Sequence, residues 1–314
     1  MQEVVATRPR EADRMEAVRE ALIRRVARWT ARADAVETAI PGLLLVRREA
    51  PTEPFSCMYE PSVLLVLQGP KRIVVGEDAF EWAGHEFVLT SVDIPVISQV
   101  LEASKEKPHL ALRLKLDQRA IAEMMVDCNL PAPKGQLTGR GMILGEGTLP
   151  LFKAFERLIG LLDEPDDIPI LAPLIQREIL YRLVMSDQGY RLRQIASVGN
   201  PSNQIARAVN WLKAHYSEPL RIEELAARVQ MSASTFHQHF RTLTAMSPLQ
   251  YQKWLRLNEA RRMMLVEHLD ATSAAFRVGY ESPSQFSREY RRLFGTPPSR
   301  DVASLRQMPA VTAV

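Results

Sequence analysis

The sequence predicts an α+β protein of two domains, an antiparallel β-barrel followed by an all-helical domain. Short apolar segments follow one another between residues 43 and 116, with turn residues rather than helical patterns between them. From residue 203 onward the apolar period is that of helices, and two similar helix-turn-helix patterns occur within one hundred residues. The length of 314 residues also favours two domains over one.

The N-terminal half begins with an expected helix over residues 11–37, in which apolar residues from Met15 to Trp29 follow the helical period. Seven strands are then expected, over residues 43–49, 62–69, 72–76, 79–82, 85–91, 95–101 and 110–116. Such closely spaced strands are typical of a small barrel or jelly roll. No strand alternates with a helix, which disfavours a parallel α/β sheet.

A helical hairpin is expected next, with helices over residues 149–162 and 170–185 and an acidic connection between them. Each helix has one apolar side, which either covers the barrel or pairs with a second chain. Residues 186–202 are polar with Gly and Pro, as a linker would be. We therefore expect one domain over residues 1–185 and a second over residues 203–304.

The first helix-turn-helix pattern starts with a helix over residues 222–230, whose apolar residues recur at i, i+3, i+4 and i+7. Ser232 suits the N-cap of the next helix because its hydroxyl can accept backbone N–H groups. Phe236 and Phe240, four residues apart, are expected to point inward. The outward side chains would then be those of Ser234, Thr235, His237, Gln238 and Arg241.

The second pattern repeats this plan. Residues 271–277 form its first helix, and Gly279 takes the turn, where a positive φ is cheap for glycine. Ser282 is the expected N-cap, with Pro283 at the first helical position. The inward residues are Phe286, Tyr290 and Leu293; the outward residues are Ser284, Gln285, Ser287, Arg288 and Arg291.

A long amphipathic helix, residues 248–266, joins the two patterns. At about 1.5 Å per residue it spans roughly 28 Å. Successive major-groove openings on one face of B-DNA lie about 34 Å apart. The spacing therefore indicates a chain that reads two adjacent grooves.

The charge distribution supports nucleic-acid binding by the C-terminal part. Residues 201–300 contain fourteen Lys and Arg against eight Asp and Glu, a net charge of +6, whereas residues 1–200 contain twenty-five against twenty-eight, a net charge of −3. Attraction to phosphates requires a basic excess where the DNA-reading helices lie. The alternative, an ordinary solvated charged surface, remains open from the charge alone.

Residues 203–300 resemble the DNA-binding domain of AraC-type (AraC/XylS) transcription regulators. The matching segments are IEELAARVQMSASTFHQHFR, SPLQYQKWLRLNEARRMML and VGYESPSQFSREYRRLFGTPPS. The chain has Ala274-Ala275 where the family often has Ile-Ala, so this helix is expected to pack more loosely. By position, the resemblance implies base contacts from Ser234, His237, Gln238, Ser284, Gln285, Ser287 and Arg288. Phosphate contacts are expected from Ser232, Thr235, Arg241, Ser282 and Arg291.

Residues 40–120 resemble the cupin-like effector domain of one branch of AraC-type regulators. The segment TEPFSCMYEPSVLLVLQGPKRIVVGEDAFEW carries most of the likeness, with the LALRLKLD run. The resemblance implies a small-molecule effector of unknown identity, a homodimer, and contact with RNA polymerase if the protein is an activator. The candidates for effector contact are Cys57, Lys71 and Arg72, although a buried inert thiol and solvated surface charges are the commoner roles of such residues.

The sequence favours neither a metal site nor an enzyme. His85 and His109 are isolated in the barrel region, and His237 and His239 are two residues apart on a helix, so their side chains do not face each other. Gly-rich phosphate loops and nucleophile-elbow motifs are absent from the sequence, and no cofactor is expected. Two alternatives stay open: a cupin enzyme fused to a DNA-binding module, and a constitutive DNA-binding protein whose barrel only dimerises.

The two cysteines, Cys57 and Cys128, and the charged N-terminus predict a reducing, cytoplasmic environment without a disulfide. No apolar run approaches eighteen residues, so no membrane partner is expected.

Overall fold

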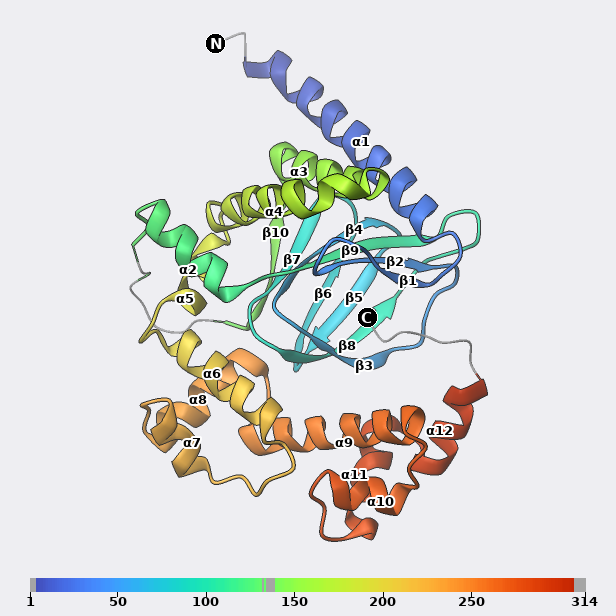
Figure 1. Cartoon of the computed structure of the whole chain (residues 1–314), viewed down its shortest axis with the longest axis vertical. Coiled ribbons are helices and arrows are strands. Elements are labelled where there is room, and N and C mark those ends of the chain that lie inside the picture. The colour runs from blue at the N-terminus through green and yellow to red at the C-terminus, as the bar shows by residue number, and fades with distance from the viewer. Residues whose placement is uncertain (1–3, 132, 134–138, 308–314) are drawn as a thin grey trace. The chain divides into compact units, whose positions relative to one another are not determined.

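A computed structural model describes residues 4–131, 133 and 139–307 of the chain. The chain divides into two compact units, with the boundary between Asn200 and Pro201 (Figure 1). In its described residues the first unit contains these strands: β1 Ala35–Glu37, β2 Leu43–Arg48, β3 Phe55–Tyr59, β4 Ser62–Gln68, β5 Lys71–Val75, β6 Asp78–Trp82, β7 Glu86–Thr90, β8 Ile94–Val100, β9 His109–Lys115 and β10 Met142–Glu146. Its helices are α1 Val4–Trp29, α2 Gln118–Asp127, α3 Leu149–Gly160, α4 Ile168–Val184 and α5 Gly189–Ala196.

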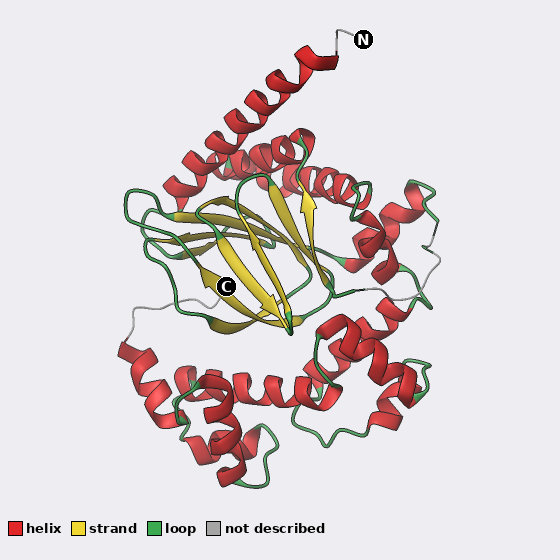
Figure 2. Ribbon diagram, turned by 180° about the vertical axis from the view of Figure 1, so that it is seen from behind, coloured by secondary structure: helices red, strands yellow, loops and turns green. Residues whose placement is uncertain are grey.

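The strands form two antiparallel sheets that face each other (Figures 1 and 2). The larger sheet has the order β1-β2-β9-β4-β7-β10 and the smaller has the order β3-β8-β5-β6. All seven strands expected from the sequence are present with ends shifted by at most one residue, whereas β1, β3 and β10 are not among those seven. The predicted α+β class with an antiparallel N-terminal domain is therefore confirmed.

Both faces of the larger sheet are buried, because consecutive side chains along its strands point to opposite faces and most of them are apolar. Leu43 and Leu45 of β2 join one apolar cluster with α1, α3 and α4, which cover that face. Leu44 and Val46 are also buried, and because successive side chains point to opposite faces, they point toward the smaller sheet. The unit thus has a helix-covered core and a second interior between its sheets.

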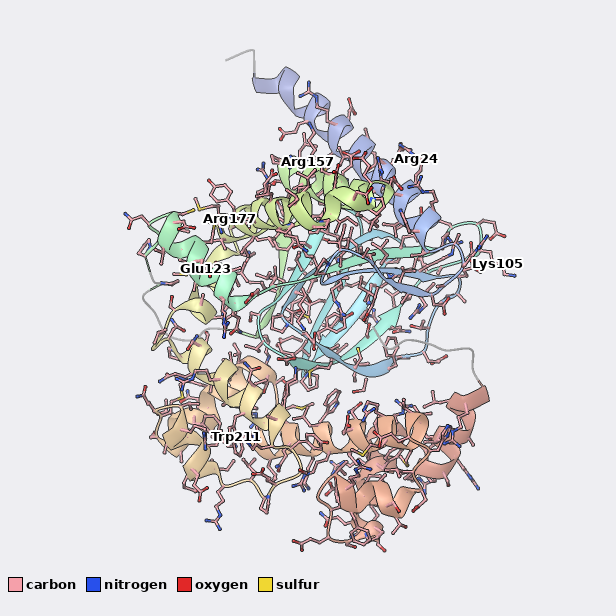
Figure 3. The ribbon with its side chains drawn as sticks, viewed as in Figure 1. Arg24, Lys105, Glu123, Arg157, Arg177 and Trp211 are labelled. Carbon is pink, nitrogen blue, oxygen red and sulfur yellow. The ribbon has the colours of Figure 1, made fainter. Side chains whose placement is uncertain are left out.

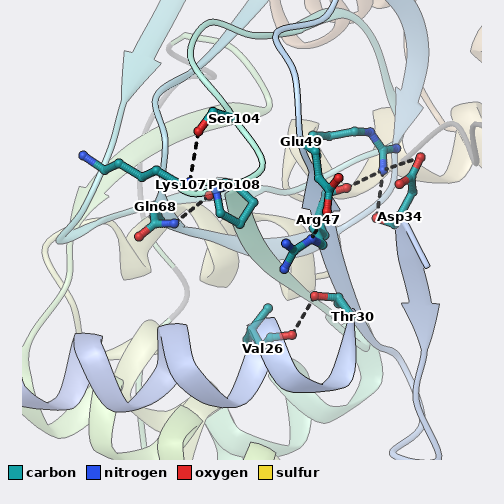
Figure 4. A network of polar contacts seen from close by, with 10 residues as sticks. Val26, Thr30, Asp34, Arg47, Glu49, Gln68, Ser104, Lys107 and Pro108 are labelled. Atoms are coloured by element: carbon teal, nitrogen blue, oxygen red, sulfur yellow. Dashed lines mark hydrogen bonds and ion pairs between the residues drawn. The ribbon is translucent and has the colours of Figure 1, made fainter. Parts of the chain in front are cut away.

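The first helix ends earlier than the sequence pattern indicated. We expected a helix over residues 11–37, but α1 stops at Trp29 and residues 35–37 form strand β1. The buried Thr30 closes the helix, and its hydroxyl donates to the Val26 carbonyl at 2.7 Å (Figure 4). Arg48 then donates to the Asp34 carbonyl at 2.8 Å and holds the chain where it turns into the sheet.

The helical hairpin is present as α3 and α4, joined by short 3-10 turns at Leu161–Asp163 and Pro165–Asp167. Ion pairs fasten the helical layer: Arg157 pairs with Glu178 across the hairpin, and Arg177 of α4 pairs with Asp127 of α2. Figure 3 labels both arginines on these helices.

Within the segment expected to be a linker, residues 189–196 form helix α5. Its Leu192 and Ile195 are 1% and 2% exposed, and Leu192 belongs to the helix-covered core of the first unit. An eight-residue helix has little intrinsic stability, so packing rather than local sequence makes it form. That is why the sequence pattern missed it.

The second unit is entirely helical in its described residues. It contains α6 Pro201–Ala214, α7 Ile222–Arg228, α8 Ala233–Thr244, α9 Pro248–Val266, α10 Ala271–Arg277, α11 Pro283–Phe294 and α12 Pro298–Gln307. The expected helices over residues 248–266 and 271–277 are confirmed to the residue, and α11 begins at Pro283 as expected. The helix expected over residues 222–230 ends at Arg228. Helices α6 and α12 were not predicted.

Candidate nucleic-acid interface

The first helix-turn-helix consists of α7 and α8. Gln230 in the turn has a φ of 61°, and Ser232 caps α8 by accepting the Thr235 amide at 3.2 Å. Phe236 and Phe240 are fully buried with their ring centroids 5.5 Å apart. The aromatic face of α8 is therefore fixed inside, and the opposite face is turned to solvent.

The second helix-turn-helix consists of α10 and α11, with Gly279 in the turn at a φ of 90°. Ser282 caps α11 by accepting the Gln285 amide at 3.3 Å. Phe286 and Tyr290 are fully buried, so the inward face of α11 is also aromatic. Ala274 and Ala275 of α10 are 0% exposed and belong to the apolar core of this helix-turn-helix.

The structure places the residues predicted from the sequence on the outer faces of α8 and α11. All seven predicted base-contacting residues are exposed: Ser234, His237, Gln238, Ser284, Gln285, Ser287 and Arg288. Of the predicted phosphate contacts, Ser232, Thr235, Arg241 and Arg291 are exposed and Ser282 is half-buried. The cap hydroxyls of Ser232 and Ser282 already accept backbone amides, so only their remaining donor capacity is left for a phosphate.

Arg288 makes no hydrogen bond or ion pair within the described part of the chain, although the carboxylates of Glu281 and Glu289 are near it in sequence. Glu289 is bound elsewhere, by Lys253 at 2.7 Å and by the Tyr280 hydroxyl at 2.7 Å. Burial raises the pKa of Glu289, but the hydrogen bonds from Lys253, Tyr280 and Gln285 outweigh it and lower the pKa. The guanidinium of Arg288 is therefore available, while the Gln285 amide must leave Glu289, 3.2 Å away, to reach a base.

Sequence reasoning missed the side chains that hold α11 in place. Lys253 and Arg256 of α9 and Asp301 of α12 bind groups of the second helix-turn-helix or of the turn before α11. Lys253 and Arg256 lie three residues apart beside the apolar stripe of α9, which is the signal that could have identified them. Asp301 lies in a helix that was not predicted.

The three effector candidates lie in different environments. Cys57 is buried, and burial raises the pKa of its thiol to about 12 against the opposing charges of Lys71 and Arg113. Lys71 is 4% exposed. Arg72, by contrast, is exposed and pairs with Glu81 at 2.9 Å, so it belongs to the outer surface.

The isolated histidines do not converge on one point. His85 is exposed, and its Nε2 lies 3.3 Å from Oε2 of Glu16. His109 is fully buried, and its Nδ1 lies 2.9 Å from the Gly69 carbonyl oxygen. The residues that the structure describes contain no group of three His, Cys, Asp or Glu side chains that could hold a metal ion. The same residues contain no helix long and apolar enough to cross a membrane.

Comparison with known proteins agrees with this geometry. Residues 39–191 match the AraC-type transcriptional regulator N-terminus, and residues 225–303 match a helix-turn-helix domain. The HTH-type transcriptional regulator CdhR of Pseudomonas aeruginosa is 30% identical over 146 residues, 46% of this chain and 44% of CdhR. The HTH-type transcriptional activator RhaS of Salmonella schwarzengrund is 28% identical over 149 residues, 46% of this chain and 52% of RhaS. The chain thus aligns with about half the length of these relatives.

A crystal structure of ToxT from Vibrio cholerae has a similar fold, with a TM-score of 0.56 at 10% identity, covering 83% of this chain and 99% of that chain. The sequence relatives are transcription regulators rather than enzymes. An N-terminal regulator domain followed by paired helix-turn-helix units places the chain in the AraC-type family of transcription regulators.

Proposed function

We propose that the chain is a sequence-specific DNA-binding transcription regulator that reads two adjacent major grooves. One observation carries the proposal. Helices α8 and α11 belong to one helical unit, and each buries an aromatic face while it turns a polar, partly basic face to solvent. A helix that is anchored on one side and polar on the other is suited to the major groove.

The polar faces divide into two kinds of contact. Arg288 would donate two hydrogen bonds to guanine O6 and N7, and Gln238 and His237 would contact base edges from α8. Arg241 and Arg291, near the C-terminal ends of α8 and α11, would bind phosphates and set the register on the duplex. RNA polymerase is a further partner if the protein activates transcription.

Selection from a pool of randomised DNA duplexes with the full chain tests this function. We expect enrichment of a site with two short conserved boxes whose centres are about ten base pairs apart. The reason is that α9, which lies between the two recognition helices, has a length close to one turn of the DNA double helix. Binding to the selected site should weaken steeply as salt rises. Enrichment of no sequence, or affinity that does not respond to salt, would exclude the proposal.

The chain would act as a homodimer through α4. The apolar side chains Ile170, Leu174 and Tyr181 are 69%, 60% and 43% exposed, and their spacing of four and seven residues places them on one side of the helix. Leu171 and Met185 extend this apolar surface. A helix that exposes this much apolar area favours contact with a second copy, the interpretation that the hairpin pattern had left open.

The first unit would bind an effector between its two sheets, and the effector would carry a negative charge. Lys71 of β5 is buried, and its ammonium makes no ion pair or hydrogen bond with the described residues; it lies 5.6 Å from the centre of the Tyr59 ring. Arg113 of the opposite sheet adds positive charge, because its charge lowers the pKa of Cys57. Arg48 of the same sheet lowers the pKa of His109 but is itself paired with Asp34 at 3.8 Å. A buried cation without a carboxylate favours a small organic anion such as a carboxylate.

His109 supplies a second polar group in this interior. A carbonyl oxygen only accepts, so Nδ1 of His109 donates to Gly69, which leaves Nε2 as an acceptor. That Nε2 atom is buried without a hydrogen-bond partner among the described residues. Lys71 and His109 together would hold a carboxylate and a neighbouring donor group of the same ligand. A constitutive protein with a purely structural barrel is the alternative.

A further inference from the structure

Arg256 of α9 binds backbone groups from two separate parts of the DNA-binding unit. Its Nε donates to the Tyr216 carbonyl at 2.7 Å, and its Nη2 donates to the carbonyls of Ser217 and Glu218 at 3.2 and 2.9 Å. These three residues precede α7 of the first helix-turn-helix. Its Nη1 donates to the Gly279 carbonyl at 2.8 Å, in the turn of the second helix-turn-helix.

The two segments that Arg256 binds are also in direct contact. A Cβ atom on Gly279 would lie 2.1 Å from the Ser217 carbonyl oxygen, so any side chain there would push the segments apart. Gln252, one turn before Arg256 on α9 and 2% exposed, donates to the Glu218 carbonyl at 2.7 Å. Two side chains of α9 therefore hold the segment before α7, and one of them also holds the turn before α11.

The contact continues from Arg256 to the second recognition helix. The guanidinium lies 5.9 Å from the centre of the Tyr280 ring, and the Tyr280 hydroxyl donates to Glu289 of α11 at 2.7 Å. Glu289 also pairs with Lys253, three residues before Arg256 on α9. A displacement of Arg256 would thus reach α11 next to Arg288, without any change in the exposed residues of that helix.

We propose that Arg256 is a positioning residue that fixes the separation and rotation of α8 and α11, and so determines which spacing of two DNA boxes the chain accepts. The inference rests on the DNA-binding function proposed above. Helix α9 alone sets a distance. Lys253 ties α11 to α9, and Arg261 and Tyr290 meet at Asp301, but these contacts hold the second helix-turn-helix only, whereas Arg256 binds backbone groups next to both units. A planar guanidinium with donors in fixed directions couples both segments at once, which a lysine ammonium cannot do in the same geometry.

The test measures affinity of the full chain for the selected two-box duplex and for duplexes with one base pair added or removed between the boxes. One base pair shifts a box by about 3.4 Å and rotates it by about 34°. For the wild type we expect at least a tenfold loss on either change. For Arg256→Met we expect less than a threefold difference in affinity among the three duplexes, because the variant loses affinity for the duplex with the native spacing. Its affinity for a duplex with a single box should equal that of the wild type.

Arg262→Met is the matched control, since Arg262 also lies on α9 but, among the described residues, forms ion pairs with Glu259 and Glu267, which are close to it in sequence. This variant should keep the wild-type spacing penalty. If Arg256→Met does not fold, Arg256→Lys decides the question: a relaxed spacing requirement supports the proposal. A full spacing penalty in either folded Arg256 variant overturns it. Failure of the wild type itself to bind any selected duplex would instead count against the DNA-binding function.

Discussion

The hydroxyl of Tyr290 donates a hydrogen bond of 2.7 Å to Oδ2 of Asp301, and so ties the second recognition helix to α12. Arg261 of α9 binds the same carboxylate, through Nε at 2.7 Å and Nη2 at 3.0 Å. Tyr290 is fully buried, and burial together with the carboxylate raises the pKa of its hydroxyl. Three helices thus meet at one carboxylate behind the proposed DNA-reading surface.

Replacement of Tyr290 by Phe should destabilise the second unit by about 1.5 kcal/mol, the lower end for a hydrogen bond to a charged group, because Arg261 still binds Asp301. Urea unfolding of the full chain measures the change in unfolding free energy. Thr272→Val, at an exposed position of α10 in the same unit, is the control and should change it by less than about 0.5 kcal/mol. Equal stability of Tyr290→Phe and wild type would show that the hydroxyl adds nothing to the packing of its ring.

Arg288→Ala should separate sequence specificity from general DNA affinity. Loss of a bidentate pair with guanine should cost about 1–3 kcal/mol on the selected site and little on random-sequence duplexes. Arg291→Ala is the contrasting variant, expected to weaken both affinities alike. The measurement is the ratio of selected-site to random-sequence affinity at fixed salt. An unchanged ratio with both affinities reduced would make Arg288 a phosphate contact instead.

The helices of the two helix-turn-helix units could be predicted closely because their signals are local. The second recognition helix begins at Pro283 after the Ser282 cap and ends before Gly295, at the residues that cap and turn chemistry indicate. Helix α12 was missed, although it also has a proline, Pro298, at its first position. What holds it is the carboxylate of Asp301, whose partners lie on α9 and α11, together with the buried Val302, and only the folded unit shows these contacts.

Buried side chains, such as Lys71 in the proposed effector site and Arg256 in the DNA-binding unit, were harder to predict than the exposed residues of the recognition helices. Strand alternation implies that Lys71 and Arg72 point to opposite faces, but not which of them is inside. The structure decides this through burial of the lysine and the surface ion pair of the arginine. Arg256 likewise reads as one of several arginines on α9, because its four acceptors are backbone carbonyls that carry no sequence signal.

Leu174→Glu should convert the proposed dimer into a folded monomer. The side chain is 60% exposed on α4, so a carboxylate there adds charge to the proposed contact without disturbing the core. Sedimentation at micromolar concentration, with circular dichroism to verify folding, provides the measurement. Val126→Glu is the matched control, since Val126 is a 79% exposed apolar residue on α2. A wild type that is already monomeric at that concentration would exclude α4 as the dimer contact.

The buried His109 should make the first unit sensitive to acid. Burial, followed by the charge of Lys71, lowers the pKa of His109 to about 3, while Arg48 adds to the effect and the Gly69 carbonyl opposes it. Below the unfolded-state pKa of about 6.5 the unfolded chain therefore binds a proton that the folded chain does not, and stability falls as pH falls. Between pH 7 and pH 5 this loss is about 2 kcal/mol.

Urea unfolding of wild type and His109→Gln at pH 7 and pH 5 measures that contribution. The variant removes the titrating ring, so its unfolding free energy should decrease by about 2 kcal/mol less than that of the wild type over this interval. The comparison between the two pH values removes any constant cost of the substitution itself. The same decrease in both proteins would mean that His109 takes up a proton in the folded state as readily as in the unfolded state.

Lys71→Met distinguishes a ligand-binding amine from a structural one. A buried ammonium without a carboxylate destabilises the unliganded fold, so an apolar side chain of similar length should raise the melting temperature in the absence of added ligand. Hexanoate or benzoate should stabilise the wild type with increasing concentration, as a ligand that binds only the folded state does, and should not stabilise the variant. Arg72→Met, one residue away on the outer face, should behave as the wild type does in both respects. A Lys71→Met protein that melts below the wild type without ligand would show that the amine supports the fold, and the proposed anion site would then have to be abandoned.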